Sequence, residues 1–147
     1  DWYLHRNTRI TRTSCNQDGS QTYHVTVTLE NVLPYEDYAN GPTYILGGGD
    51  LRGHSVDKIL FYAPAGGFIS NLTVGGSAQI DDPQQGNFRG NSIIYTVANI
   101  AYGQNATFDI DVTTSPKAKE DLKLDQTPMG WVETGVEYEK PSCEIKE

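Results

Sequence analysis

The stretch of sequence that decides the fold spans residues 22–31 and reads Thr-Tyr-His-Val-Thr-Val-Thr-Leu-Glu-Asn. Apolar and polar side chains alternate along it, which is typical of a β-strand with one buried and one solvated face. We therefore predict a strand in the interior of a sheet. The side chains expected in the core are Tyr23, Val25, Val27 and Leu29. Those expected on the opposite face are His24, Thr26, Thr28 and Glu30.

The segment before this strand, residues 2–13, predicts its antiparallel neighbour. It is rich in threonine, arginine and aromatic residues and has no helical periodicity. Between the two strands lies Asp18-Gly19, a dipeptide that adopts the positive φ angles that hairpin turns need. The sequence therefore predicts a β-hairpin.

The rest of the chain continues in short units separated by glycine and proline. Polar turns or loops are predicted at residues 35–42, 47–55, 75–76, 81–87 and 115–130. Residues 106–113 alternate as cleanly as residues 22–31, with apolar side chains at even positions. Further strands are predicted at residues 43–46, 56–63, 68–74, 77–80, 92–98, 106–113 and 131–138. About eight or nine short strands without a helix predict an all-β fold, an antiparallel β-sandwich of Ig-like general architecture or a related barrel.

Length and charge limit the organisation and the partners. A chain of 147 residues can bury its own core, so we predict a single domain spanning residues 1–147. The formal net charge of -8 provides no basic surface for nucleic acid. No apolar run is long enough for membrane insertion by this segment. The chain begins with Asp1 rather than methionine, so we expect it to derive from a longer protein.

The two cysteines, Cys15 and Cys143, lie near opposite ends of the chain. They form no C-x-x-C motif, and one pair cannot supply the four ligands of a structural zinc site. In a cytosolic protein they would be unrelated thiols. In an exported protein they would form a disulfide, the reading that we favour, with an ideal entropic stabilisation of about 4 to 5 kcal/mol.

Enzymatic and metal-binding motifs give weak signals. The glycine-rich segment 47–55 ends in His54-Ser55, where a phosphate-binding loop would have lysine, and a strand rather than a helix is predicted after it. No G-x-S-x-G or H-E-x-x-H motif occurs. We therefore predict no catalytic residues, no cofactor and no metal site. The weak calcium candidates are Asp81 and Asp82, together with Asp109 and Asp111.

Three tyrosines are the candidate binding residues. Tyr35 and Tyr38 lie in an acidic loop, and Tyr44 follows shortly after it. Exposed aromatic rings stack on sugars and anchor protein partners, whereas tyrosines in such loops more often pack back over the rim of the sandwich. Both readings stay open at this point.

Several segments together resemble domain-of-unknown-function family 4012. The resemblance begins at Asp1-Trp2-Tyr3-Leu4 and continues through the hairpin turn, residues 23–31 and Leu33-Pro34-Tyr35. It extends more weakly through residues 59–66, 72–76 and 126–129 to Cys143. Members of this family look like bacterial cell-envelope proteins. The resemblance implies that the chain is the carboxy-terminal, extracytoplasmic part of a membrane-anchored protein, and it carries over no active residues.

We therefore expect a non-catalytic interaction or spacer module of a bacterial cell-envelope protein, attached to the membrane through a segment outside this chain. The expected partner is an envelope protein or a cell-wall glycan. One alternative is a carbohydrate-binding module that uses the exposed tyrosines. Another is an accessory domain of an envelope enzyme.

Overall fold

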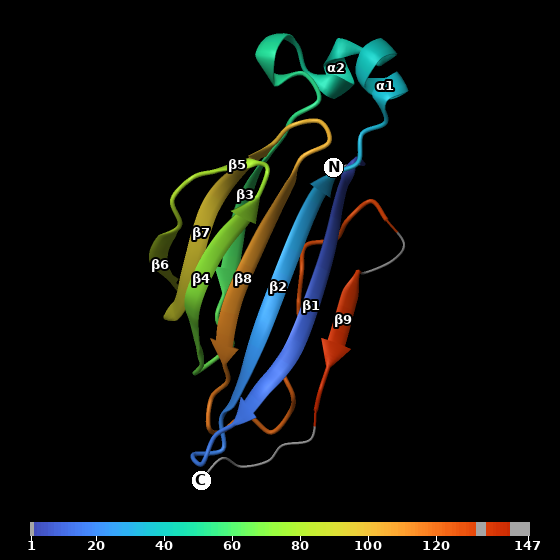
Figure 1. Cartoon of the computed structure of the whole chain (residues 1–147). Helices are drawn as coiled ribbons and strands as arrows, with labels where there is room; N and C mark the ends of the chain where they lie inside the picture. The colour runs from blue at the N-terminus through green and yellow to red at the C-terminus, as the bar shows by residue number, and fades with distance from the viewer. Residues whose placement is uncertain (1, 132–134, 142–147) are drawn as a thin grey trace.

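The computed structural model describes residues 2–131 and 135–141 and consists of two β-sheets packed face to face (Figure 1). One sheet contains β1 (Leu4–Cys15), β2 (Gln21–Asn31), β4 (Phe68–Gly76), β8 (Asn105–Thr113) and β9 (Val136–Glu139). The other contains β3 (Ser55–Tyr62), β5 (Gln79–Ile80), β6 (Gln84–Phe88) and β7 (Asn91–Ile100). Neither sheet closes into a barrel in the described residues, and the predicted sandwich is confirmed.

The strands are arranged in the order β4-β8-β2-β1-β9 in the five-stranded sheet. In the four-stranded sheet β7 lies between β3 on one side and β5 and β6 on the other. Strand β2 therefore occupies the middle of its sheet, as its alternating sequence predicts. It pairs antiparallel with β1 and β8, with Ile10 opposite Val25 and Val25 opposite Ile110.

The predicted hairpin between β1 and β2 is confirmed. Gly19 has a φ of 89°, a conformation that glycine adopts without steric cost. The side chain of Asp18 accepts a hydrogen bond from the backbone N–H of Ser20 at 2.9 Å. This local bond and the glycine together set the turn at the position that the sequence indicates.

The core lies between the sheets and contains the predicted faces of β2 and β8. Tyr23 and Phe108 are fully buried, and Val27, the most exposed member of the predicted face of β2, is only 8% exposed. Burying an aliphatic side chain of this size stabilises the fold by about 1.5 to 3 kcal/mol. The remaining predicted core members are also buried: Val25, Leu29, Ala106, Ile110 and Val112.

The last strand differs from the predicted antiparallel arrangement, because β9 runs parallel to β1, with Ile10 opposite Tyr138. Residues 115–130, here called the crossover segment, contain no helix or strand and carry the chain back to the start of β9. A parallel pair needs a long connection of this kind. Of the predicted strand at residues 131–138, residues 132–134 lie outside the described part of the chain.

Residues 35–53 form a small cap at one end of the sandwich (Figure 1), where the sequence predicted a loop and a strand. The cap contains α1 (Tyr35–Asn40), α2 (Thr43–Leu46) and the 3-10 turn η1 (Gly49–Leu51). The prediction of a strand at residues 43–46 was wrong, because Pro42 precedes a single helical turn whose only buried member is Leu46. A four-residue apolar run does not distinguish a helical turn from a strand.

The predicted turn at Gly75-Gly76 was also wrong. Both glycines belong to β4, where Gly75 lies opposite Thr107 and Gly76 opposite Ala106. The chain then changes sheets, because β4 pairs with β8 whereas β5 pairs with β7. Strand length and alternation do not reveal to which sheet a strand belongs.

The polar segment 81–87 is only partly a loop, because β6 begins at Gln84. This strand pairs with β7 alone in the described residues, and its glutamines are exposed. Polar residues suit such an edge position, since they discourage pairing with other chains. The polar composition of this segment therefore did not predict a strand.

Candidate functional site

The three candidate tyrosines lie in the cap but have different surroundings. Tyr44 is 87% exposed and Tyr35 is 69% exposed. Tyr38 stacks on Tyr102 with ring centroids 4.8 Å apart, and the guanidinium of Arg52 lies 5.8 Å from its ring centre. Tyr38 therefore packs within the cap, whereas Tyr35 and Tyr44 are largely exposed, and the binding role of the three tyrosines stays a prediction.

Side-chain hydrogen bonds to backbone oxygens hold the cap in place. Arg52 donates to the carbonyl oxygens of Tyr38 at 2.9 Å and Gly41 at 2.8 Å. The buried amide of Asn31, at the end of β2, donates to the carbonyl oxygens of Gly53 and Ile100. These bonds connect the cap to both sheets, so its exposed side chains project from an ordered support.

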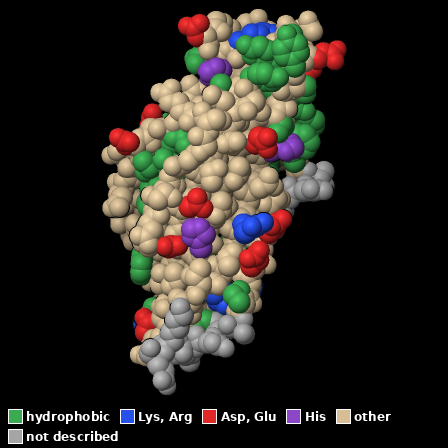
Figure 2. Space-filling view, in the orientation of Figure 1, with side chains coloured by type: hydrophobic (Ala, Val, Ile, Leu, Met, Phe, Trp, Pro, Cys, Tyr) green, Lys and Arg blue, Asp and Glu red, His purple; other side chains and the backbone are tan. Residues whose placement is uncertain are grey.

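The cap exposes apolar side chains that have no role in the core. Figure 2 shows hydrophobic side chains gathered at this end of the molecule, with acidic side chains at the margin. The exposed members of the cap are Tyr35, Tyr44, Ile45 and Leu51. Glu36 and Asp50 are also exposed in the same segment. A group of exposed large apolar side chains on a loop region is typical of an interaction surface.

The calcium candidates do not form a common site. Asp81 and Asp82 are exposed between β5 and β6, and the backbone of Asp81 bonds Val97 and Thr96. Asp109 and Asp111 lie on β8, in the other sheet. Within residues 2–131 and 135–141, no group of three or more His, Cys, Asp or Glu side chains is arranged to hold a metal ion.

Asp109 and Asp111 instead flank His24, a residue that we predicted to be an ordinary solvated side chain. His24 Nδ1 lies 2.9 Å from Asp111 Oδ1, and His24 Nε2 lies 3.3 Å from Asp109 Oδ1. The hydrogen bond with Asp111 is the main cause of a raised pKa at His24. The amide of Asn71 donates to Asp111 at 2.7 Å, and this bond, followed by that of His24, lowers the pKa of Asp111. We call these four residues the His24 cluster.

Pairing of the strands brings the His24 cluster together. His24 lies directly opposite Asp111 in the β2–β8 register. Asn71 reaches Asp111 from an irregularity in β4, where its φ is 54°. The alternation along β2 and β8 predicts that His24, Asp109 and Asp111 face outward. It does not predict that they lie opposite one another, because that depends on the register between the two strands.

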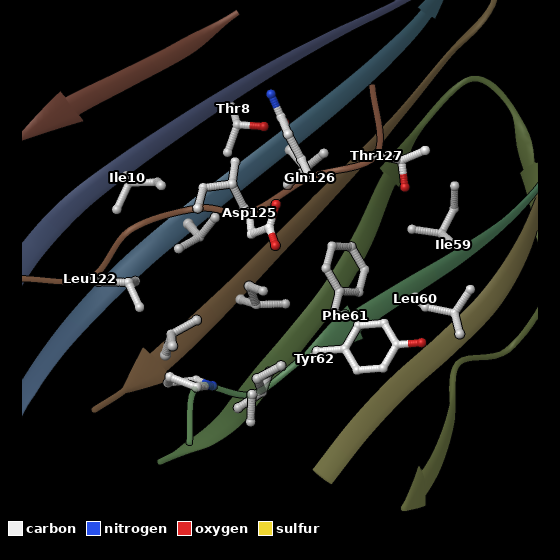
Figure 3. A pocket seen from close by; sticks show the side chains of 18 of the residues that line it. Thr8, Ile10, Ile59, Leu60, Phe61, Tyr62, Leu122, Asp125, Gln126 and Thr127 are labelled. Atoms are coloured by element: carbon white, nitrogen blue, oxygen red, sulfur yellow. The ribbon is translucent and has the colours of Figure 1, made fainter. Parts of the chain in front are cut away.

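A cleft of about 730 Å³ lies between the two sheets, beside β3 (Figure 3). One wall is formed by residues 58–64, and the opposite wall by residues 122–127 of the crossover segment. Its floor is the apolar inner face of the five-stranded sheet, including Ile10, Val25 and Val27. A volume of this size is within the range of ligand-binding pockets. This cleft was not predicted from the sequence, because the crossover segment was predicted only as a connection.

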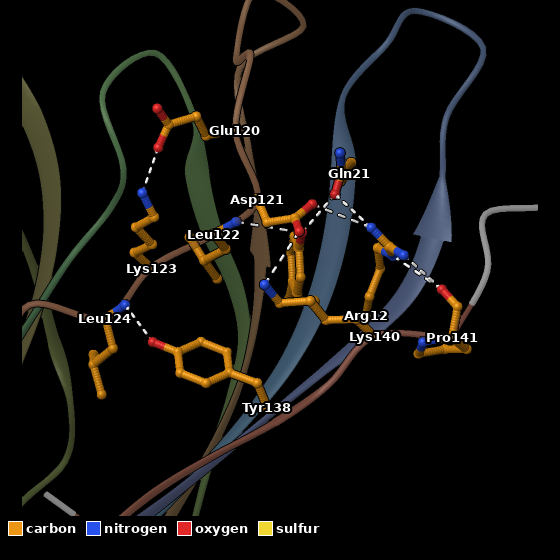
Figure 4. Close-up of polar contacts among 11 residues, drawn as sticks. Arg12, Gln21, Glu120, Asp121, Leu122, Lys123, Leu124, Tyr138, Lys140 and Pro141 are labelled. Carbon is orange, nitrogen blue, oxygen red and sulfur yellow. Dashed lines mark hydrogen bonds and ion pairs between the residues drawn. The ribbon is translucent and has the colours of Figure 1, made fainter.

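Polar contacts hold the crossover segment against β1 and β9 (Figure 4). Asp121 accepts hydrogen bonds from Arg12 at 3.2 Å and from Lys140 at 3.1 Å, and its bond with Lys140 is the main cause of its lowered pKa. The backbone N–H of Leu124 donates to the Tyr138 hydroxyl at 3.0 Å. Further along, Arg6 donates to the carbonyl oxygen of Thr127 at 2.6 Å. These contacts keep the far wall of the cleft in place.

The other two histidines have structural contacts. His5 lies edge-on to Trp131 with ring centroids 4.1 Å apart, and Trp131 in turn stacks on Trp2. His54 Nδ1 lies 2.7 Å from the side-chain oxygen of Asn99. These are aromatic packing and hydrogen-bonding contacts within the fold.

The disulfide between Cys15 and Cys143 stays a prediction. Cys15 is the last residue of β1 and is partly buried. Cys143 lies outside the described residues.

Comparison with known proteins leaves the family open: no protein-family model and no curated protein matches this chain. In the described part of the chain, no helix has the length and apolar character that crossing a membrane requires. The resemblance to domain-of-unknown-function family 4012 therefore stays a prediction.

Proposed function

We propose that the chain is a non-catalytic interaction module of an extracytoplasmic cell-envelope protein and that the cap binds a protein partner. The observation that carries the proposal is the exposure of Tyr35, Tyr44, Ile45 and Leu51 on a support held by Arg52 and Asn31. Large side chains on an ordered support lose little conformational freedom on binding, and aromatic residues are frequent in binding hot spots.

Charge specifies the partner further. The exposed carboxylates of Glu36 and Asp50 lie in the same segment as the apolar side chains, whereas the cation of Arg52 is engaged within the cap. The chain as a whole carries a net charge of -8. A protein surface with an apolar centre and a basic margin fits these features best.

The test begins by introducing a photo-cross-linking amino acid at position 44 of the full-length protein in its native envelope. The cross-linked partner is identified and purified, and its affinity for this chain is measured. We expect the Tyr44→Ala, Ile45→Ala double variant to lose at least about tenfold in affinity, because truncated hot-spot side chains commonly cost more than 1.4 kcal/mol.

Phe68→Ala is the matched control, since Phe68 is a 53% exposed aromatic residue on β4, outside the cap and outside the cleft. It should bind the partner as the unmodified chain does. Equal affinity of the double variant and the unmodified chain would exclude the cap as the binding surface and leave the module as a spacer.

Carbohydrate recognition is the second candidate, favoured by the exposure of Tyr44 and Tyr35. Both rings are accessible enough to stack on a sugar. Titration with soluble cell-wall glycan fragments tests this function. Saturable binding that is lost in a Tyr35→Ala, Tyr44→Ala variant would indicate that the partner is a glycan rather than a protein.

A further inference from the structure

Strand β3 forms one edge of the four-stranded sheet. In the described residues its only strand partner is β7, with Ser55 opposite Ile100 and Tyr62 opposite Ile93. Within residues 2–131 and 135–141, no backbone–backbone hydrogen bond joins its other side to the crossover segment. An edge strand of eight residues with apolar character is a natural template for another strand.

The register identifies the backbone groups that point away from β7. The N–H of Ala63 donates to the carbonyl oxygen of Ser92 at 3.1 Å. Residues that bond to one neighbour alternate along an antiparallel strand, so Ile59 and Phe61 also bond β7. The N–H and C=O groups of Lys58, Leu60 and Tyr62 therefore point toward the open edge.

This open edge coincides with a wall of the cleft in Figure 3. The side chains of Ile59 and Phe61 point from β3 into the core side and are only partly buried, and Val27, 8% exposed, lies on the floor. Leu122 lies on the opposite wall. An extended backbone placed along β3 would direct every second side chain onto this apolar floor, because side chains alternate between the two faces of a strand.

The cleft also differs from the rest of the chain in charge. Three of its lining residues are basic, namely Arg6, Lys58 and Lys123, and one is acidic, Asp125; Lys123 is paired with Glu120, so the cleft has a small positive excess. The whole chain, by contrast, has a net charge of -8. A ligand that enters the cleft is therefore favoured if it carries negative charge at its end.

We infer that the cleft binds an extended segment of a partner protein, apolar at alternate positions and acidic at one end, which adds to β3 as a new strand. The backbone groups of Lys58, Leu60 and Tyr62 supply the hydrogen bonds, and the apolar floor selects the side chains. This mode of recognition uses the main chain for affinity and alternate side chains for specificity. The site is separate from the cap, so it does not depend on the function proposed for the cap.

The probe is a set of seven-residue peptides that alternate threonine with valine, leucine, isoleucine or phenylalanine and end in glutamate. Binding is measured by calorimetry, with scrambled peptides as controls. For the best binder, two further peptides are made, each N-methylated on one of the two alternating sets of residues. Only one of the two should lose at least about tenfold in affinity, since only one set directs its N–H groups at β3.

Amide hydrogen exchange gives a residue-specific readout on the protein itself. In the free protein, the amides of Lys58, Leu60 and Tyr62 should exchange faster than those of Ile59 and Phe61. The peptide should slow exchange at the first three and leave the other two nearly unchanged, because β7 already protects them.

Leu60→Pro removes one of the N–H groups at the open edge and should weaken peptide binding at least about tenfold. Proline is tolerated at an edge position whose N–H points away from the sheet. Val56→Pro is the matched control, because Val56 belongs to the same edge but does not line the cleft. Circular dichroism verifies that both variants are folded.

Three results would overturn the inference. The first is that none of the alternating peptides binds better than its scrambled control. The second is equal binding of both N-methylated forms. The third is a stable dimer of the chain in solution in which the amides of Lys58, Leu60 and Tyr62 are already protected, since β3 would then pair with a second copy.

Discussion

The outer faces of β2 and β8 in one sheet and of β3 and β6 in the other carry different kinds of side chain. On the five-stranded sheet, the outward side chains of β2 and β8 pair with one another, as in the contacts of His24 with Asp109 and Asp111. On the four-stranded sheet, the outward side chains include Val56, Tyr62 and Phe88, exposed by 57%, 53% and 47%. Solvent-facing polar pairs suit a surface that stays in water, whereas exposed apolar groups favour contact with another molecule.

The edges of the sheets differ in the same way. Strand β1 is covered by β9, and Arg12 connects it to the crossover segment through Asp121. Strand β3 has β7 on one side and the cleft on the other. The comparison therefore contrasts an edge that is covered by another strand with an edge that has a strand partner on one side alone in the described residues.

The largest effect is predicted for an aspartate substitution in the core. The same substitution on an outer face serves as the comparison. Val27→Asp places a carboxylate among buried apolar side chains of β2, where Val27 is 8% exposed. An unpaired buried charge costs several kcal/mol, against a total stability of about 5 to 15 kcal/mol. We expect this variant to be largely unfolded by circular dichroism and thermal denaturation.

The matched substitution is Leu60→Asp, on the outward face of β3, where Leu60 is 39% exposed. Its carboxylate remains in water, so we expect a loss of less than about 1 kcal/mol. If Leu60→Asp unfolds the chain as Val27→Asp does, the outer face of the four-stranded sheet belongs to the core and the contrast between the sheets fails.

Sequence reasoning found the central strands because their local pattern and their tertiary environment agree. Alternation along residues 22–31 and 106–113 places the same side chains in the core that the packed sheets bury, Tyr23 and Phe108 among them. The turn at Gly19 was equally local, since the sequence shows a glycine preceded by an aspartate, and Gly19 adopts a φ of 89°. Local signals of this kind do not require knowledge of the partner strand.

The features that sequence reasoning missed depend on contacts between distant segments. The His24 cluster needs the register that places His24 opposite Asp111, and the cleft needs the position of Leu122 relative to β3. The packing of Tyr38 was missed because Tyr102, far along the chain, stacks on its ring. Residue types identified the candidates, but the topology decided which of them are accessible.

The second prediction concerns Arg9 and Arg12, two arginines of β1. Arg12 has a 14% exposed side chain and bonds both Asp121 and the carbonyl oxygen of Pro141. Arg12→Ala should lower the melting temperature by about 3 to 6 °C, because it removes these hydrogen bonds and the packing of the arginine stem.

Arg9→Ala is the control on the same strand. Arg9 is 62% exposed, and its pairs with Glu137 and Glu139 lie at the surface. Exposed ion pairs contribute little, so a change of no more than about 1 or 2 °C is expected in a thermal scan. Equal shifts in the two variants would show that the contacts at Asp121 do not anchor the crossover segment more firmly than a surface pair.

The smallest predicted effect is the pH dependence of the His24 cluster. The folded-state pKa of His24 is raised, chiefly by its hydrogen bond with Asp111. Its contribution to stability is therefore fully present below the unfolded-state pKa of about 6.5 and is lost as the pH rises through the folded-state pKa. The lowered pKa of Asp111 keeps that carboxylate ionised in mildly acidic solution.

His24→Gln removes the titrating ring and keeps a polar side chain at a position whose side chain is 46% exposed. Urea denaturation at about pH 5.5 should show that the unmodified chain is more stable than this variant by about 0.5 kcal/mol, with the difference shrinking at about pH 8.5. A difference that grows with pH would reverse the assigned sign. Because the same two carboxylates face the ring from β8, Asp111→Asn should reduce the pH dependence as well, whereas a purely steric effect of residue 24 would leave it unchanged.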